Sequence, residues 1–460
     1  MGERAAALEE APVLPPLSPG AGTVALVGGT VFLGDGKRLE PGTVVLSHGK
    51  ILAVGPADQV KVPNGATTVD ARGRFVTPGL IDTHSHLGVY ATPHVEGTAD
   101  GNEMTDPTTP YVFSEHAFWP QDPGLSRALA GGITSLQILP GSGNVIGGRS
   151  VTFKLRPRLE ARAMRIPDAP FGLKMACGEN PKRVYGTLKQ QPMSRMGNIT
   201  KLRQAFLKAK EYNFLQRAHE AEYATWQQKY EAAKANPVGA EPPGKEPRRP
   251  DRNLGFETLA DAMAGKIQVH IHCYRADEML LMIALSKELG FKIASFHHAV
   301  EAYKIADVLA KEGIGASMWA DWWGFKLEAW DGIEENIAAV SAAGGLAIVH
   351  SDSEIGIQRL NQEAAKALAS GRRLGLSVNE DDAIRWVTLN PAKALGIDRR
   401  TGSLEVGKDA DVVVWSGSPL SIYGKADQVY IDGELTFDRQ QGLRPVSDFE
   451  VGTEMEEVLP

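Results

Sequence analysis

The chain has 460 residues, of which 43% are hydrophobic and 23% charged, as in an ordinary soluble globular protein with room for one large domain and an accessory unit. Its formal net charge of −7 argues against a nucleic-acid-binding surface, and the sequence contains no apolar run long enough to span a bilayer. We therefore expect neither nucleic acid nor a membrane among its partners.

The first segment, residues 1–22, is rich in Ala, Glu and Pro and lacks the basic start and apolar core of a signal peptide. We interpret it as a flexible leader, and residues 441–460 as a C-terminal tail. The compartment stays open: the chain as it stands predicts a cytoplasmic protein, and an exported one if a signal has been trimmed from its start.

Short strands separated by glycine turns are predicted over residues 23–77, and residues 389–440 show the same pattern. The expected strands are Thr23–Val27, Thr43–Ser47, Ile51–Val54, Asp411–Trp415 and Gln428–Ile431. Asp432-Gly433 is typical of a hairpin turn. Two β segments that flank a long middle predict one composite β-sandwich.

The middle of the chain, residues 78–388, alternates predicted strands and helices, which is the pattern of a parallel sheet in an α/β fold. The expected strands are Gly79–Thr83, Ile133–Leu139, Gly172–Cys177, Ile267–Cys273, Lys292–His297, Gly315–Met318 and Leu346–His350, with a poorly marked strand at Ser150–Leu155. The expected helices include Ala276–Leu289, Ala302–Glu312 and Ile333–Ala343.

Two insertions interrupt this pattern. Gly88–Pro123 is a long loop, and residues 198–256 form a helical insertion that begins with a long amphipathic helix, Asn198–Ala235. Asn198 or Thr200 is the expected N-cap of that helix. We expect the helix to pack on the body of the protein or on a second subunit. In the second case the protein would be a homo-oligomer.

Two cysteines, Cys177 and Cys273, are too few for a disulfide scaffold and form no CxxC motif. The commoner fate of a free cysteine is burial in the core, here at two strand ends. That reading fits a reducing compartment.

His84 and His86 carry the strongest chemical signal. Side chains two apart on a strand point the same way, so the pair can aim two imidazoles at one metal ion. The alternative is two surface histidines, but here the pair ends an apolar strand that follows the Pro78-Gly79 turn.

Three motifs resemble the amidohydrolase superfamily, in particular its imidazolonepropionase- and prolidase-like branch. Val76–His86 is similar to its first barrel strand with the metal-binding pair, and Gly131–Thr134 to its second strand. Asn390–Ala392 and Gly402–Asp411 are similar to its C-terminal signature. The resemblance covers about Thr23 to Phe437 and implies a (β/α)8 TIM barrel over residues 78–388, with its active site at the C-terminal ends of the strands.

The resemblance also implies ligands for one or two divalent ions, with zinc as the first choice and manganese, iron or cobalt as options. The expected ligands are His84, His86, His272, His298 and Asp352. His270 lies one layer deeper and is more simply a core histidine. His297 competes with His298 on the sixth strand and is otherwise a candidate substrate contact.

A bridging ligand is expected from the fourth strand, where family members use a carboxylated lysine or a glutamate. Lys174 faces inward with Ala176 in the predicted alternation, and a buried lysine needs a partner or a shifted pKa. Glu179, just past the strand, is the rival. We favour Lys174 as the bridge. The alternative, purely structural roles are a buried salt bridge for Lys174 and a helix cap or substrate contact for Glu179.

Such a centre would lower the pKa of a shared water, so that a metal-bound hydroxide exists at neutral pH, with Asp352 as general base and then acid. We therefore expect hydrolysis of an amide, peptide-like or N-acyl C–N bond in a small molecule, as in a dipeptidase, with a carboxylate as a candidate substrate feature. The candidate substrate contacts are Arg183, Tyr185, Arg195, Arg275, His297, Trp322 and Trp323. A solvated surface is the alternative for the arginines, and packing at the barrel rim for the tryptophans.

Three other functions are kept open. A deaminase is disfavoured because Arg275 stands where the adenosine deaminase branch places a glutamate. A lactonase or phosphotriesterase would use the same metals. A non-catalytic scaffold is disfavoured because the set of expected ligands is complete.

Overall fold

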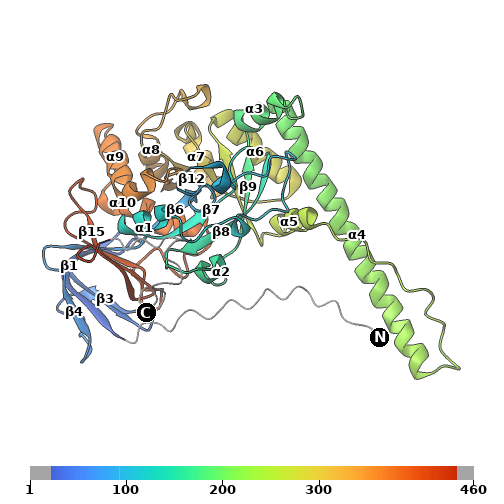
Figure 1. Ribbon diagram of the computed structural model, residues 1–460, viewed down its shortest axis with the longest axis horizontal. Coiled ribbons are helices and arrows are strands. Elements are labelled where there is room, and N and C mark those ends of the chain that lie inside the picture. Colours follow the sequence, from blue (N-terminus) through green and yellow to red (C-terminus); the bar gives the residue numbers. More distant parts are fainter. Residues whose placement is uncertain (1–21, 93, 443–460) are drawn as a thin grey trace.

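The computed structural model describes residues 22–92 and 94–442 (Figure 1). Nearly all of the predicted leader and tail, residues 1–22 and 441–460, lies outside the described residues. The described chain contains two sheets of eight strands each, and helices surround the central one.

The central sheet follows the order of the chain from one edge to the other. Its strands are β6 (Leu80–Ser85), β7 (Ile133–Ile138), β8 (Ile146–Lys154), β9 (Gly172–Ala176), β10 (Gln268–Cys273), β11 (Ile293–His298), β12 (Gly315–Met318) and β13 (Leu346–Val349). Almost every residue of these strands is buried, because helices cover one face and side chains fill the other. The sheet is nearly closed: the Asp352 N–H, just after β13, donates to the His84 carbonyl of β6 at 3.0 Å.

The expectation of an all-parallel sheet is wrong for one strand. β8 runs antiparallel to both of its neighbours, β7 and β9, whereas the other neighbouring pairs are parallel. Antiparallel strands can be joined by short connections, so no long crossover helix is needed on either side of β8. The strand also begins earlier than predicted, at Ile146, within a Gly-rich stretch that hides it in the sequence.

Helices follow most of the parallel strands. They are α1 (Pro123–Ala130), α2 (Ala161–Met164), α3 (Glu179–Thr187), α5 (Leu254–Met263), α6 (Ala276–Leu289), α7 (Ala306–Glu312), α8 (Asn336–Ala342), α9 (Leu360–Arg373), α10 (Glu380–Trp386) and α11 (Leu389–Ala394). The resemblance motif Asn390–Ala392 lies in α11, where Asn390 Nδ2 donates to the Ala347 carbonyl of β13 at 2.7 Å.

The second sheet is built from both ends of the described chain and lies at the lower left of Figure 1. Its strands are β1 (Val24–Phe32), β2 (Arg38–Ser47), β3 (Lys50–Pro56), β4 (Thr67–Asp70), β5 (Phe75–Pro78), β14 (Val412–Trp415), β15 (Ala426–Ile431) and β16 (Glu434–Asp438). The two ends meet where β14 pairs antiparallel with β5, with Val412 opposite Pro78.

A buried lysine joins the two sheets. Lys154, at the end of β8, lies with its Nζ 2.8 Å from Asp409 Oδ2, 3.0 Å from Asp411 Oδ2 and 2.5 Å from Asp432 Oδ1. Burial lowers the pKa of Lys154, but the three carboxylates outweigh it and hold that pKa above its usual value. The C-terminal signature therefore has a structural role, because Asp409 and Asp411 neutralise a buried cation.

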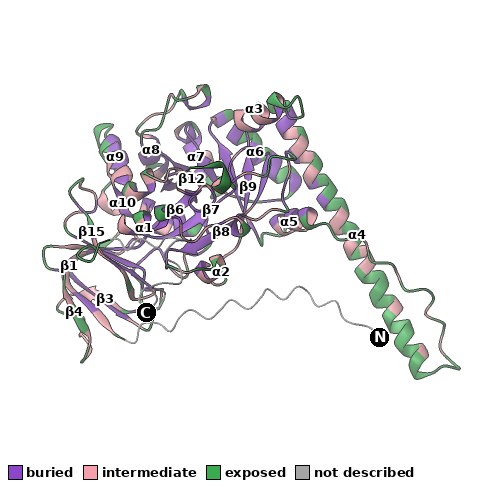
Figure 2. Ribbon diagram, in the orientation of Figure 1, coloured by how far each residue is buried: buried purple, intermediate pink, exposed green. Residues whose placement is uncertain are grey.

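The helical insertion projects from the body as a long arm, α4 (Arg195–Ala235) (Figure 1). Its N-cap is Ser194, whose Oγ accepts from the Gly197 N–H at 3.2 Å; the expected caps, Asn198 and Thr200, are wrong. Asn198 instead donates to the Gly178 carbonyl at 2.8 Å. The first half of α4 buries an apolar stripe on the body, and the second half is mostly exposed (Figure 2).

None of the described helices, α4 included, combines the length and the hydrophobicity needed to cross a membrane.

The expectation of two free cysteines is wrong, because Cys177 and Cys273 form a disulfide. The register of β9 and β10 pairs Ala176 with His272, so the two residues that follow lie side by side at the ends of neighbouring strands. The disulfide thus ties together the two strands that carry Lys174 and His272.

Candidate metal centre

His84 and His86 face one point together with Asp352. Nε2 of His84 lies 3.2 Å from Nε2 of His86 and 3.5 Å from Asp352 Oδ1, and Nε2 of His86 lies 3.3 Å from the same oxygen. These three side chains form a group that could hold a metal ion. The first strand therefore brings both imidazoles of the motif to one place, at the C-terminal end of β6.

His272 and His298 approach the same place from β10 and β11. Their ring centroids are 4.5 Å apart, and His298 Nδ1 lies 3.9 Å from Asp352 Oδ2. Among the described residues, His272 Nε2 and His298 Nδ1 are buried and have no hydrogen-bond partner. Buried nitrogens of this kind are what a metal ion would satisfy.

The opposite ring nitrogens are occupied by protein groups. His86 Nδ1 donates to the Leu139 carbonyl at 2.8 Å, and His272 Nδ1 lies 2.8 Å from Ser142 Oγ. His84 Nδ1 lies 2.7 Å from His297 Nδ1. Contacts of this kind fix the ring orientation of metal-binding histidines and leave the other nitrogen free as a ligand.

Left-handed backbone shapes the rim of the site. His298, Ala299 and Asp352 have φ angles of 71°, 40° and 49°, in a region that residues other than glycine seldom adopt. Such conformations cost about 1–3 kcal/mol each and cluster at functional sites. At His298 the turn breaks the strand alternation, so His297 and His298 both face the interior; the two are not alternatives, as the sequence suggested.

Lys174 and Glu179 lie in different surroundings. Lys174 is fully buried with its Nζ 3.4 Å from His84 Nε2, and burial lowers its pKa to about 8. Glu179 is the first residue of α3, is half-buried, and is absent from the groups of potential ligands found among the described residues. This placement favours Lys174 as the bridging candidate.

The protonation states suit a metal. Burial lowers the pKa values of His84, His272 and His298 well below 6.5, so these rings are neutral at pH 7. Burial raises the pKa of Asp352, but its contacts with His86, His350 and Lys174 together outweigh burial, so the net pKa lies below 3.8 and the group is a carboxylate.

Sequence reasoning missed three residues around this centre. His350 Nε2 accepts from the His298 N–H at 3.1 Å, and His350 forms a second potential metal group with His84 and His298. Tyr274 stacks on the His298 ring at 5.1 Å. Asp82 accepts from the His84 N–H at 3.0 Å, and burial raises its pKa to about 7. The pattern His350-Ser351-Asp352 was a visible signal for the first.

The candidate substrate contacts are dispersed. Tyr185 is fully buried and donates to Asn144 Oδ1 at 2.6 Å, and His297 lies behind His84; neither faces a substrate. Arg183 is exposed on α3. Arg195 is exposed and Arg275 is half-buried; they lie 3.5 Å and 2.9 Å from Asp277.

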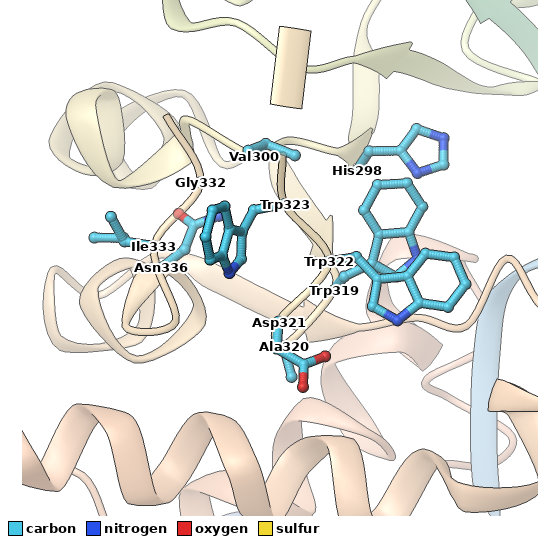
Figure 3. A pocket seen from close by; sticks show the side chains of 10 residues that line it. All are labelled: His298, Val300, Trp319, Ala320, Asp321, Trp322, Trp323, Gly332, Ile333 and Asn336. Carbon is cyan, nitrogen blue, oxygen red and sulfur yellow. The ribbon is translucent and has the colours of Figure 1, made fainter. Parts of the chain in front are cut away.

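Trp322 and Trp323 line a pocket beside His298 (Figure 3). The pocket has about 230 Å³ of empty space, part of it open to solvent. Trp319 stacks on the His298 ring at 4.3 Å, and Trp322 stacks on Trp319 at 5.2 Å. Trp323 stands on the other side of the pocket, near Ile333 (Figure 3).

Comparisons with known proteins agree with these features. The amidohydrolase family model matches residues 331–439. The chain is 35% identical over 426 residues to amidohydrolase tasK of Hapsidospora irregularis, which covers 90% of this chain and 41% of that protein. The chain thus spans less than half the length of that relative.

Two other matches extend over most of both chains. Imidazolonepropionase of Fusobacterium nucleatum is 22% identical over 86% of this chain and 92% of its own. The crystal structure of an amidohydrolase from Thermotoga maritima is 37% identical, with a TM-score of 0.76, and the match covers 90% of this chain and all of that one (100%). The chain belongs to the amidohydrolase family.

Proposed function

We propose that this protein is a metal-dependent hydrolase that cleaves the C–N bond of an amide, peptide-like or N-acyl compound. One observation carries the proposal: Nε2 of His84 and Nε2 of His86 face each other at 3.2 Å while the Nδ1 atoms of both rings are engaged elsewhere. In neutral rings that carry their protons on Nδ1, the two Nε2 lone pairs would repel each other at that distance, and a shared cation would remove the repulsion.

The donor set fits a divalent ion. Histidine nitrogens with a carboxylate suit zinc first, and manganese, iron or cobalt as options. We propose His84, His86, His272, His298 and Asp352 as the ligands, with Lys174 as the bridge between two ions after carboxylation. Bound there, a divalent metal supplies Lewis acidity, which activates water and polarises a carbonyl group.

Asp352 is the proposed proton carrier. Its Oδ1 lies 3.3 Å from His86 Nε2 and its Oδ2 lies 3.9 Å from His298 Nδ1, so the carboxylate stands at the point where the ligands meet. Because its pKa is held low, it is ionised at neutral pH and can accept the proton of the attacking water. It can then deliver this proton to the leaving nitrogen.

The tryptophan pocket is the proposed site for an apolar part of the substrate. It shares His298 with the metal centre, so a group seated between Trp322 and Trp323 would stand next to the reacting bond. Large aromatic faces that are 41% and 54% exposed offer apolar area to such a group. The names of the relatives, amidohydrolase and imidazolonepropionase, are in keeping with C–N bond cleavage.

For the fold, we propose the (β/α)8 barrel and β-sandwich that the resemblance implies, with β8 reversed. The sequential strand order and the hydrogen bond between Asp352 and His84 support closure of the central sheet.

The test is an activity screen of the zinc- and manganese-loaded enzyme over dipeptides, N-acyl amino acids and cyclic amides. Compounds with an apolar side chain should be cleaved best, and a Trp322→Ala, Trp323→Ala double variant should raise KM for these more than for glycine analogues. Ready turnover of lactones or aryl phosphotriesters with no amide cleaved would refute the proposed reaction.

A further inference from the structure

Three buried side chains behind His84 form a polar cluster that the proposed function does not use. His297 lies with its Nδ1 2.7 Å from His84 Nδ1, and its Nε2 lies 2.8 Å from Ser295 Oγ. Ser295 Oγ lies 3.0 Å from His270 Nδ1. All three side chains are fully buried.

The direction of these hydrogen bonds follows from His84. Its Nε2 faces His86, Asp352 and Lys174 at 3.2, 3.5 and 3.4 Å and is the ligand atom of the proposed metal centre, so with a metal bound its ring proton sits on Nδ1 and is donated to His297. His297 must then accept at Nδ1 and carry its own proton on Nε2.

We propose that His297 is a positioning residue for His84, and that Ser295 and His270 hold His297 in the one tautomer that can accept the His84 proton. The inference rests on the proposed function, because it assumes that His84 Nε2 is a metal ligand.

His84 and His86 differ in the kind of group that contacts their Nδ1 atoms, and this difference explains why His84 needs the cluster. His86 is oriented by a carbonyl oxygen, which can only accept, so its tautomer is fixed by one contact. An imidazole can donate or accept at either nitrogen, so His297 alone would leave the His84 tautomer open. Ser295 Oγ can then accept from His297 Nε2 and donate to His270 Nδ1, which leaves the His270 proton on Nε2, a buried atom without a partner among the described residues. His270 Nδ1 also lies 3.2 Å from His297 Nε2 and can accept the His297 proton when the Ser295 hydroxyl is removed.

The backbone explains how His297 reaches this place. Register pairs His297 with His272, and His270 with Ser295, so the residues of the cluster lie on the inner face of neighbouring strands. The left-handed backbone at His298 then brings the His298 side chain to the rim of the site. Consecutive histidines thus serve two layers, His298 beside Asp352 and His297 behind His84.

The experiment measures metal affinity by competition with a chromophoric zinc chelator, and the visible spectrum of the cobalt-loaded protein. His297→Phe keeps a ring but removes the acceptor, and should weaken binding about 10–100-fold, the usual effect of losing a contact that orients a ligand. His297→Asn can place an amide oxygen near the lost Nδ1 and should restore affinity to within a few-fold. Ser295→Ala should lie between these, because His270 can still accept from His297.

Ser317→Ala is the matched control. Ser317 is also fully buried and lies opposite His297 in the register of β11 and β12, where its Oγ accepts from Thr83 Oγ1 at 2.9 Å, but it forms no hydrogen bond with His84 or His297 among the described residues. Its affinity and cobalt spectrum should match those of the parent. Thermal unfolding of the metal-free proteins checks the fold of each variant.

The outcomes separate the two proposals. If His84→Ala leaves the metal content unchanged, the proposed metal centre fails. If His84→Ala loses metal but His297→Phe and Ser295→Ala keep the parent affinity and spectrum, only the positioning role fails. Equal losses in Ser295→Ala and Ser317→Ala would also overturn it, since they would indicate a general packing effect. If His297→Phe does not fold, the comparison of the two serine variants decides the question.

Discussion

Replacement of Lys174 by alanine should remove one metal ion per chain. The structure places its Nζ 3.4 Å from His84 Nε2 in a fully buried position. A lysine can bridge two cations only after its amine has reacted with carbon dioxide, which forms a carbamate and releases a proton. That reaction needs the neutral amine, so the pKa of Lys174 controls it.

The shifted pKa determines how large a fraction of the Lys174 amine is neutral and able to react. Burial lowers the pKa of Lys174 from 10.5 to about 8. At pH 7.5 the difference between pH and pKa is about −0.5 for the buried amine and −3.0 for an ordinary one. The neutral fractions are therefore roughly one quarter and one thousandth, a gain of about 200-fold. Burial thus prepares Lys174 for carboxylation.

Metal analysis and mass spectrometry test this reasoning. The parent protein, refolded without metal and then loaded with zinc, should gain its second ion faster with added bicarbonate, and faster still as the pH rises toward 8. Lys174→Ala should bind one ion fewer, with partial rescue of activity by short carboxylic acids. Glu179→Gln is the matched comparison. If Lys174→Ala keeps both ions while Glu179→Gln loses one, the glutamate is the bridge.

Three further predictions concern catalysis, binding and stability. Asp352→Asn should keep its metal but lose about 10²–10⁴ in kcat, as expected for a general acid–base group, and an unaffected kcat would remove the proposed proton path. The double variant His84→Ala, His86→Ala should lose both metal and turnover, and unchanged metal in elemental analysis would contradict the ligand assignment. Lys154→Met should lower the free energy of unfolding by about 3–5 kcal/mol in urea denaturation, because it leaves buried carboxylates without a cation; a loss below 1 kcal/mol would contradict this. The pKa of Asp409 is lowered to about 2, so its stabilising contribution should persist above pH 4 and disappear as the pH falls toward 2.

Most of the central sheet could be predicted because its strands are runs of apolar residues that end in polar ones. The seven well-marked strands lie within about two residues of their expected bounds. β8 was poorly predicted because Gly147 and Gly148 obscure its start, and strand direction leaves no local pattern in a sequence. The disulfide between Cys177 and Cys273 was missed because its cysteines are 96 residues apart and only strand register brings them together.

The candidate ligands could be named because most of them lie at or just beyond the end of a strand, but the contacts around them could not. The roles of His297, Ser295 and His270 depend on which ring nitrogen faces which neighbour, and spacing along the chain does not specify this. Tyr185 was placed near a substrate by its position after the fourth strand, whereas the structure turns it into the core against Asn144.

The left-handed residues explain why spacing is a weak guide at this rim. Strand alternation predicts that only one of two consecutive histidines faces inward, and it holds only while the backbone stays extended. At His298 and again at Asp352 the backbone leaves that region just where the strand has ended. Two kinds of backbone therefore position the side chains of the site. Regular strands position the inner layer, where His84 contacts His297. Left-handed turns position the outer layer, where His298 lies near Asp352. A substitution that relaxes a turn would therefore displace His298 or Asp352 while His84 and His297 keep their places on the strands.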